Sequence, residues 1–91
     1  MKDREKEYCK IIGNAIRQLR KKQTQKSLTI FAYENDIPSS TLSHIELGQN
    51  QPGIVNLKKI ATSLNISLPE LITIIEKNLP SDFSIFEDDH Y

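Results

Sequence analysis

The apolar residues in the first third of the chain recur at helical spacing. Ile12, Ile16 and Leu19 stand at positions i, i+4 and i+7 of the segment from Glu5 to Lys22, which contains no proline. This spacing places the three side chains on one face of a helix and leaves the basic side chains of the segment outward. The pattern therefore predicts a long first helix.

A short second helix is predicted after a polar break. The segment from Gln23 to Lys26 interrupts the apolar period, and the hydroxyl of Ser27 can accept a hydrogen bond from the free amides of a following helix. We expect this helix to run from Leu28 to Asn35, with Phe31 and Ala32 facing the core.

A third helix is predicted close behind the second. Asp36 and Ile37 allow only a tight connection, and Pro38 has the fixed φ angle with which a helix can begin. We expect this helix over Ser39 to Leu47, because Gly48 is suited to end it. Its inward positions are Leu42 and Ile45.

Two further helices complete the pattern. A polar loop from Gln49 to Gly53 precedes apolar residues that resume helical spacing, and Ser67 with Glu70 matches a capping box at the start of a fifth helix. We expect the fifth helix from Leu68 to about Leu79, before Pro80. The inward residues of the fourth helix are Leu57, Ile60, Ala61 and Leu64.

The net charge of zero conceals a gradient along the chain. Residues 1–30 hold nine Lys or Arg side chains against three acidic ones, whereas residues 31–79 have a net charge of −2 and residues 80–91 of −4. Such asymmetry is typical of a protein with a polyanion-binding face and an acidic tail. The tail has no sustained helical period and is expected to be disordered on its own.

Composition excludes several classes of protein. No apolar run approaches the roughly 20 residues of a membrane-spanning helix, and residues 1–10 lack the apolar core of a secretory signal, so we expect a cytoplasmic protein. The single cysteine, Cys9, can form neither an internal disulfide nor a multi-cysteine metal site. Because the sequence has no glycine-rich phosphate loop and no nucleophile paired with a base, we expect no enzyme activity, no cofactor and no metal.

The second and third predicted helices form the unit that carries the function. Two short helices joined by a tight turn can present the second of them to the major groove of DNA. Phe31, Ala32 and Ile37, followed by the run from Ser39 to Gly48, make this unit resemble the XRE family of phage-repressor and Cro-like helix-turn-helix proteins. The resemblance covers roughly residues 11–73 and implies an all-α, five-helix, lambda-repressor-like fold.

The resemblance assigns the base contacts to the third helix. Ser39, Ser40, Thr41 and His44 stand where members of the family reach base edges. Hydroxyl groups can bind several bases and His44 can donate to N7 of guanine, but none of the four offers the bidentate selectivity of Arg or Gln. The alternative is that these polar side chains are only solvated.

The resemblance also implies a structural ion pair and a set of DNA-backbone contacts. Arg20 and Glu46 occupy positions that form a partly buried ion pair in many relatives. Leu28 replaces a glutamine that usually contacts phosphate, and the loop after the third helix carries amides where relatives often carry Lys or Arg. Nearby lysines are expected to compensate, unless they form only a solvated surface. The expected backbone contacts are Lys21, Lys22, Lys26, Ser27, Leu28, Gln49, Asn50 and Gln51.

The fifth predicted helix is apolar over more of its circumference than one intramolecular face requires. We interpret this surplus as a homodimer interface. The alternative is a fully buried helix, with Phe83 and Phe86 of the tail covering the excess. The expected interface residues are Leu71, Ile74, Ile75 and Leu79.

Two functions fit an organisation with a charged N-terminal extension (residues 1–10), a helix-turn-helix DNA-binding domain (residues 11–79) and an acidic aromatic tail (residues 80–91). The first is a transcriptional regulator, a repressor, that binds a palindromic operator in double-stranded DNA as a dimer. The second is an antitoxin that captures its toxin through the tail, since such segments fold on binding a basic partner, and that represses its own operon.

Overall fold

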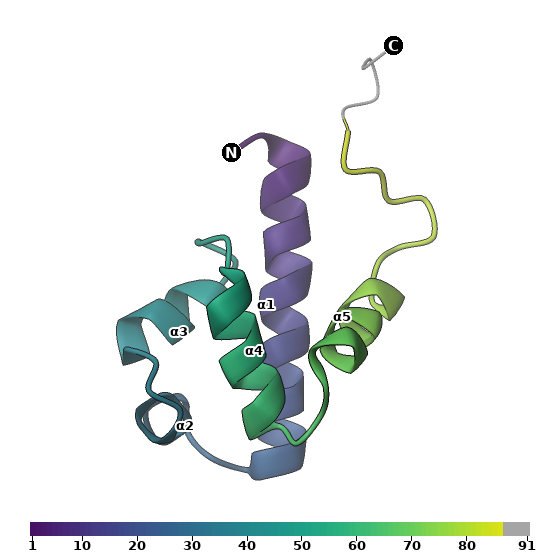
Figure 1. Cartoon of the computed structure of the whole chain (residues 1–91). Coiled ribbons are helices and arrows are strands. Elements are labelled where there is room, and N and C mark those ends of the chain that lie inside the picture. Colours follow the sequence, from purple (N-terminus) through teal and green to yellow (C-terminus); the bar gives the residue numbers. More distant parts are fainter. Residues whose placement is uncertain (87–91) are drawn as a thin grey trace.

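The computed structural model describes residues 1–86, and this part of the chain folds into five helices with no strand (Figure 1). The all-α, five-helix fold expected from the sequence is confirmed. In the described part, no helix is long and apolar enough to cross a membrane. The helices are α1 (Asp3–Thr24), α2 (Leu28–Glu34), α3 (Ser39–Glu46), α4 (Ile54–Ser63) and α5 (Leu68–Lys77).

Helix α1 is longer at both ends than its apolar period indicates. At its start a carboxylate oxygen of Glu5 accepts a hydrogen bond from the backbone amide of Lys2 at 3.0 Å. At its end the hydroxyl of Thr24 donates to the carbonyl of Arg20 at 2.7 Å, and Gln25 adopts a left-handed φ of 58°. Local hydrogen bonds therefore extend the helix beyond its apolar face, and a left-handed residue ends it.

The helix-turn-helix unit is bounded by the residues expected to bound it. The hydroxyl oxygen of Ser27 accepts a hydrogen bond from the amide of Ile30 at 3.3 Å, which confirms the cap of α2. Asp36 has a φ of 54° in the tight turn, and Gly48 has a φ of 74° just beyond α3. Glycine reaches that conformation without steric cost, so it ends α3 where predicted.

The capping box of α5 is also confirmed. The amide of Glu70 donates to the hydroxyl of Ser67, and the carboxylate of Glu70 accepts from the amide of Ser67, both at 3.2 Å. The helix ends at Lys77, before the expected position, because the side-chain amide of Asn78 donates to the carbonyl of Ile74 at 2.9 Å. The side chain of Asn78 thus satisfies a carbonyl of the last turn.

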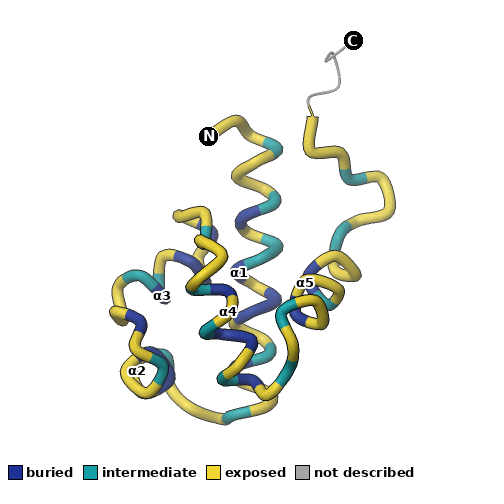
Figure 2. The backbone as a smooth tube through the Cα atoms, viewed as in Figure 1, coloured by how far each residue is buried: buried dark blue, intermediate teal, exposed yellow. Residues whose placement is uncertain are grey.

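One core joins the five helices, and α1 runs through the middle of it. Helix α1 lies between α3 on one side and α5 on the other, as the arrangement of the ribbons and the packing of these pairs both indicate (Figure 1). Buried positions line the inner sides of the helices (Figure 2). The largest fully buried side chains are Phe31, Ile16, Leu42, Ile45, Ile60, Leu71 and Ile75.

Helices α1 and α3 approach so closely that only glycine fits between them. A Cβ atom built on Gly13 would lie 2.1 Å from the carbonyl oxygen of Ile45 and 2.7 Å from that of Glu46. Both are backbone atoms and cannot turn away as a flexible side chain can. Gly13 therefore fixes the spacing between α1 and the end of α3.

The described part of the tail follows a defined path along the α5 side of the molecule, away from α3 (Figure 1). The ring of Phe83 stacks on Tyr8 of α1, with centroids 5.9 Å apart. Residues 81–86 form no helix, as expected from the absence of a helical period, and the aromatic pair connects this part of the tail to α1. Phe86 is 55% exposed and covers little of the core. Residues 87–91 lie outside the described part.

Tyr8 links the tail to α5 as well as to α1. Its hydroxyl donates a hydrogen bond to the Glu76 carboxylate at 2.5 Å. This hydrogen bond, together with partial burial and the negative charge of Glu76, raises the pKa of Tyr8 from 10.0 to about 12. The start of α1, the end of α5 and Phe83 are therefore held together at one side chain.

A Tyr8→Phe variant tests this link. It keeps the ring contact with Phe83 but removes the hydroxyl, so the free energy of unfolding should fall by about 1 kcal/mol at neutral pH, allowing for partial solvent exposure. The folded-state pKa is raised, so the contribution is complete below the unfolded value of 10.0 and is lost as the pH rises through about 12. Urea unfolding of both proteins across this range measures the difference. Tyr33, which is 87% exposed, provides the control Tyr33→Phe, and equal losses in the two variants would contradict the assignment.

Candidate nucleic-acid interface

Helix α3 presents a polar stripe to solvent. Leu42, Ile45 and Glu46 face inward, whereas Ser39, Ser40 and His44 are exposed and Thr41 is half-buried at one flank. At 100° per residue, Ser40, His44 and Leu47 stand at positions i, i+4 and i+7 and share one face. The four predicted base-contact residues are therefore unequal: Ser40 and His44 lie on the outer stripe, and Ser39 and Thr41 flank it. The inward residues of α3 fix which face remains outside.

Leu47 is a member of this stripe that the sequence analysis did not single out. It follows directly after α3 and is 55% exposed, although it is apolar. The helical spacing from Ser40 would have found it. A cavity of about 310 Å³ beside it is lined by Arg17, Arg20, Leu28, Ser43, Glu46 and Leu47.

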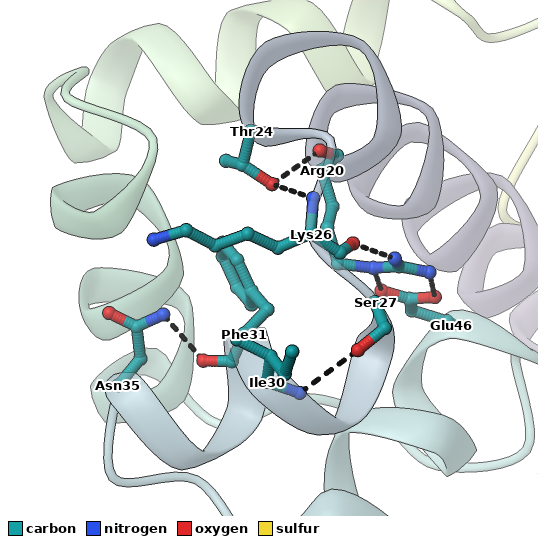
Figure 3. A network of polar contacts seen from close by, with 8 residues as sticks. All are labelled: Arg20, Thr24, Lys26, Ser27, Ile30, Phe31, Asn35 and Glu46. Carbon is teal, nitrogen blue, oxygen red and sulfur yellow. Dashed lines mark hydrogen bonds and ion pairs between the residues drawn. The ribbon is translucent and has the colours of Figure 1, made fainter.

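A buried ion pair fixes the angle of α3 against α1 (Figure 3). Nε and Nη2 of Arg20 donate to the two carboxylate oxygens of Glu46 at 2.8 and 2.9 Å, and Nη1 donates to the carbonyl of Lys26 at 2.7 Å. Arg20 is 5% exposed and Glu46 7% exposed. The bond to Glu46 raises the pKa of Arg20, although burial alone would lower it. The pair thus joins α1, α3 and the connection to α2.

The three lysines predicted to contact phosphate lie in different surroundings. Lys22 lines a cavity with Ile74 and Asn78, on the α5 side of α1. The ammonium group of Lys26 forms an ion pair with Glu34 on α2. Lys21 is exposed. Lys22 is two residues beyond Arg20 and therefore about 200° around α1 from the side chain that faces α3. The structure does not bring Lys22 to the α3 side.

The other predicted backbone contacts lie on the α3 side but carry no charge. Ser27 is exposed at the start of α2, and Leu28 is half-buried beside Leu47. The loop that follows Gly48 exposes three residues, Gln49, Asn50 and Gln51. The backbone amide of Gln49 donates to the carbonyl of His44 at 2.8 Å, which holds the start of this loop against α3.

The predicted dimer interface on α5 needs correction at two positions. Leu71 is 0% exposed and Ile75 1% exposed, so the core of the same chain already covers them. Ile74 and Leu79 are half-buried. The sequence pattern showed that α5 is apolar on several sides, but α1 and α4 take up the side that carries Leu71 and Ile75. Both residues leave the candidate interface.

Other exposed apolar residues lie near α5. Ile54 and Val55 at the start of α4 are 64% and 65% exposed, and Ile72 of α5 is 37% exposed. Ile72 lines a cavity with Leu57 of α4. The start of α4 and one flank of α5 therefore both carry exposed apolar side chains. Within residues 1–86, no group of three or more His, Cys, Asp or Glu side chains could hold a metal ion.

Two short helices in one core, with the polar face of the second turned outward and its angle fixed by a buried ion pair, define a helix-turn-helix DNA-binding domain. Residues 16–71 match the helix-turn-helix family, and the chain belongs to the XRE-type members of that family. The protein is a DNA-binding regulator of this type, and the resemblance seen in the sequence is confirmed.

Two known control proteins are similar to this chain, one in sequence and one in fold. The chain is similar to the control protein C.MunI of a Mycoplasma species, with 42% identity over 65 residues that cover 71% of this chain and 88% of that protein. Its fold is similar to that of the restriction-modification controller protein C.AhdI from Aeromonas hydrophila. That comparison has a TM-score of 0.64 and 30% identity, and it covers 69% of this chain and 94% of the other.

A Glu46→Gln variant tests how strongly the ion pair holds α3. The change leaves a buried guanidinium group without a counter-charge, and we expect the free energy of unfolding to fall by about 3 kcal/mol. Glu34→Gln is the matched control, because the Lys26–Glu34 pair is about half exposed, with both side chains at 45%, and should cost under about 1 kcal/mol. Urea unfolding compares the two, and equal losses would show that the buried pair does not stabilise the α1–α3 contact.

Proposed function

We propose that this protein is a transcriptional repressor that binds a near-palindromic operator as a homodimer. The observation that carries the proposal is the outer stripe of α3, where Ser40, His44 and Leu47 project from a helix held by the Arg20–Glu46 pair. A rigid helix with short side chains can enter the major groove closely.

The chemistry of the stripe favours sequence recognition by several modest contacts. The hydroxyl of Ser40 can donate or accept, His44 can donate to N7 of guanine, and Leu47 can contact a thymine methyl group. Ser39 and Thr41 stand at the flanks of the stripe and supply further hydroxyls. Because none of these side chains makes a bidentate contact, two copies of α3 on two half-sites are needed for a high ratio of specific to non-specific affinity.

The dimer is proposed to form through the apolar surface where α4 begins and α5 passes. Ile54, Val55 and Ile72 are exposed there, and an unpartnered apolar surface on a small domain favours self-association. Leu79, which is half-buried, can extend the contact along α5, because it lies two helical turns beyond Ile72 on the same face. Ile74 lies on another flank of α5, beside Lys22, and is not part of this proposed contact. A two-fold dimer of this kind binds half-sites separated by about 34 Å, one turn of DNA.

The genes under control are proposed to be those of a restriction-modification system. The similarity to C.MunI and C.AhdI, which are named as control and controller proteins, supports this proposal. Repression requires no further domain, because a dimer bound over one turn or more of promoter DNA excludes other proteins from that DNA.

The antitoxin function remains a second candidate, favoured by one feature of the tail. Ile85 and Phe86 are 40% and 55% exposed, so apolar side chains of the tail are accessible to a partner protein. Ile85 also lines a cavity with Gln51 and Pro52, so a toxin bound there would lie close to the loop after α3.

The first test concerns the base contacts. In duplexes selected by the wild-type protein from a random-sequence library, Ser40→Ala with His44→Ala should lose about 1 to 3 kcal/mol of binding free energy per contact. Affinity for unrelated duplexes should persist, because phosphate contacts carry it. Thr62→Ala, an exposed hydroxyl on α4, is the control. Unchanged affinity of the double variant for the selected duplex would exclude α3 as the reading helix.

The second test concerns the dimer. Val55→Glu places a charge on the proposed interface, so sedimentation should show a weaker dimer while circular dichroism shows unchanged helix content. Leu71→Glu places the same charge in the core and should reduce helix content instead. If Val55→Glu sediments as a dimer of wild-type strength, the interface lies elsewhere on the molecule.

A further inference from the structure

The helix-turn-helix unit lacks the charge that DNA binding requires. From Ser27 to Leu57 the sequence contains no Lys and no Arg, while Glu34, Asp36 and Glu46 are acidic. Attraction to the phosphate backbone supplies most of the affinity of DNA-binding proteins for any duplex. The positive charge must therefore come from side chains outside this segment.

Several cations near the unit are already engaged. The guanidinium of Arg20 binds Glu46, and the ammonium of Lys26 binds Glu34. The ammonium of Lys59 donates to the carbonyl of Asp36 at 2.9 Å and lies 3.8 Å from its carboxylate. These three groups balance the acidic residues of the unit. The balance leaves its outer surface close to neutral.

Two unengaged cations of α1 lie beside the unit. Arg17 is exposed and lies one turn before Arg20 on α1. It lines the same cavity as Leu28 and Leu47. Lys10 is exposed, and its Cα and Cγ atoms lie 2.6 Å from where a Cβ of Gly48 would stand. Within residues 1–86, neither side chain has an ion pair or a hydrogen bond.

Each of the two cations lies next to an uncharged part of the DNA-facing surface. Arg17 is beside Leu28, where α2 begins, and Lys10 is beside Gly48, where the amide-rich loop begins. The two are seven residues apart, which is two helical turns and about 10 Å along α1. Successive phosphates of one strand rise by about 3.4 Å along the DNA axis, so two side chains this far apart can reach different phosphates.

We propose that Lys10 and Arg17 are DNA-phosphate contacts, so that α1 supplies the positive charge that the helix-turn-helix unit lacks. The inference rests on the proposed DNA-binding function and extends the contact surface from α3 to one flank of α1. Lys22 lies on the opposite flank, beside Ile74 and Asn78, and has no such role.

The test compares two double variants of equal net charge. Lys10→Gln with Arg17→Gln removes the proposed contacts, and Lys22→Gln with Lys77→Gln removes two exposed cations that lie on the α5 side of α1 and on α5 itself. Affinity for the selected duplex is measured by fluorescence anisotropy over a series of salt concentrations. Each lost phosphate contact should reduce the slope of log K against log salt by about 0.9.

The expected result is a slope lower by about 3.6 for the first variant, because each of the two protomers loses two contacts, with roughly a 900-fold loss of affinity near 0.15 M salt that shrinks as salt rises. The control variant should keep the wild-type slope. An unrelated duplex should show the same difference, because phosphate contacts carry no sequence information. Equal slopes for the two variants on both duplexes would overturn the inference, whereas failure of the wild-type protein to select any sequence would overturn the proposed function instead. Circular dichroism verifies that both variants fold.

Discussion

The contact between α1 and α3 is the constraint on which the rest of this structure depends. At one point Gly13 allows the backbones to touch, and two turns later Arg20 closes a bidentate pair with Glu46. The first contact sets the distance between the helices, and the second sets their angle. Since α3 has few buried residues of its own, this double attachment gives a helix of eight residues a fixed orientation. The same guanidinium also ties down the connection to α2 through Lys26.

Helix α1 divides the molecule into two sides with different chemistry. On one side lie α3, its outer stripe and the uncharged loop. On the other lie α5 and the described part of the tail, which Phe83 anchors through Tyr8. The two sides meet at one place, because Ile85 of the tail lines a cavity with Gln51 and Pro52 of the loop after α3. A partner bound to the tail would therefore lie close to that loop.

The helices could be predicted from the sequence because their signals are local. Ser27, the Ser67–Glu70 box and Gly48 act within a few residues of where they stand, and all three mark helix ends as expected. What the sequence could not supply is which neighbour covers a given face. The sequence pattern suggested that Leu71 and Ile75 are surplus apolar surface, but both are buried in the core of the same chain. The tail contacts α1 through Phe83 and Tyr8, which are 75 residues apart along the chain. Base, phosphate and dimer contacts stay predictions because they depend on a second molecule.

The near-absence of positive charge from the helix-turn-helix unit bears on how a regulator finds its target. Every stretch of chromosome offers the same phosphates, so a strongly cationic recognition unit is retained by millions of irrelevant sites. From Ser27 to Leu57 this chain has only His44 with any capacity for a positive charge. In the proposed complex, Lys10 and Arg17 of α1 contact phosphates and α3 contacts base edges. Affinity for any duplex and preference for one sequence therefore depend on different helices and can change independently of each other.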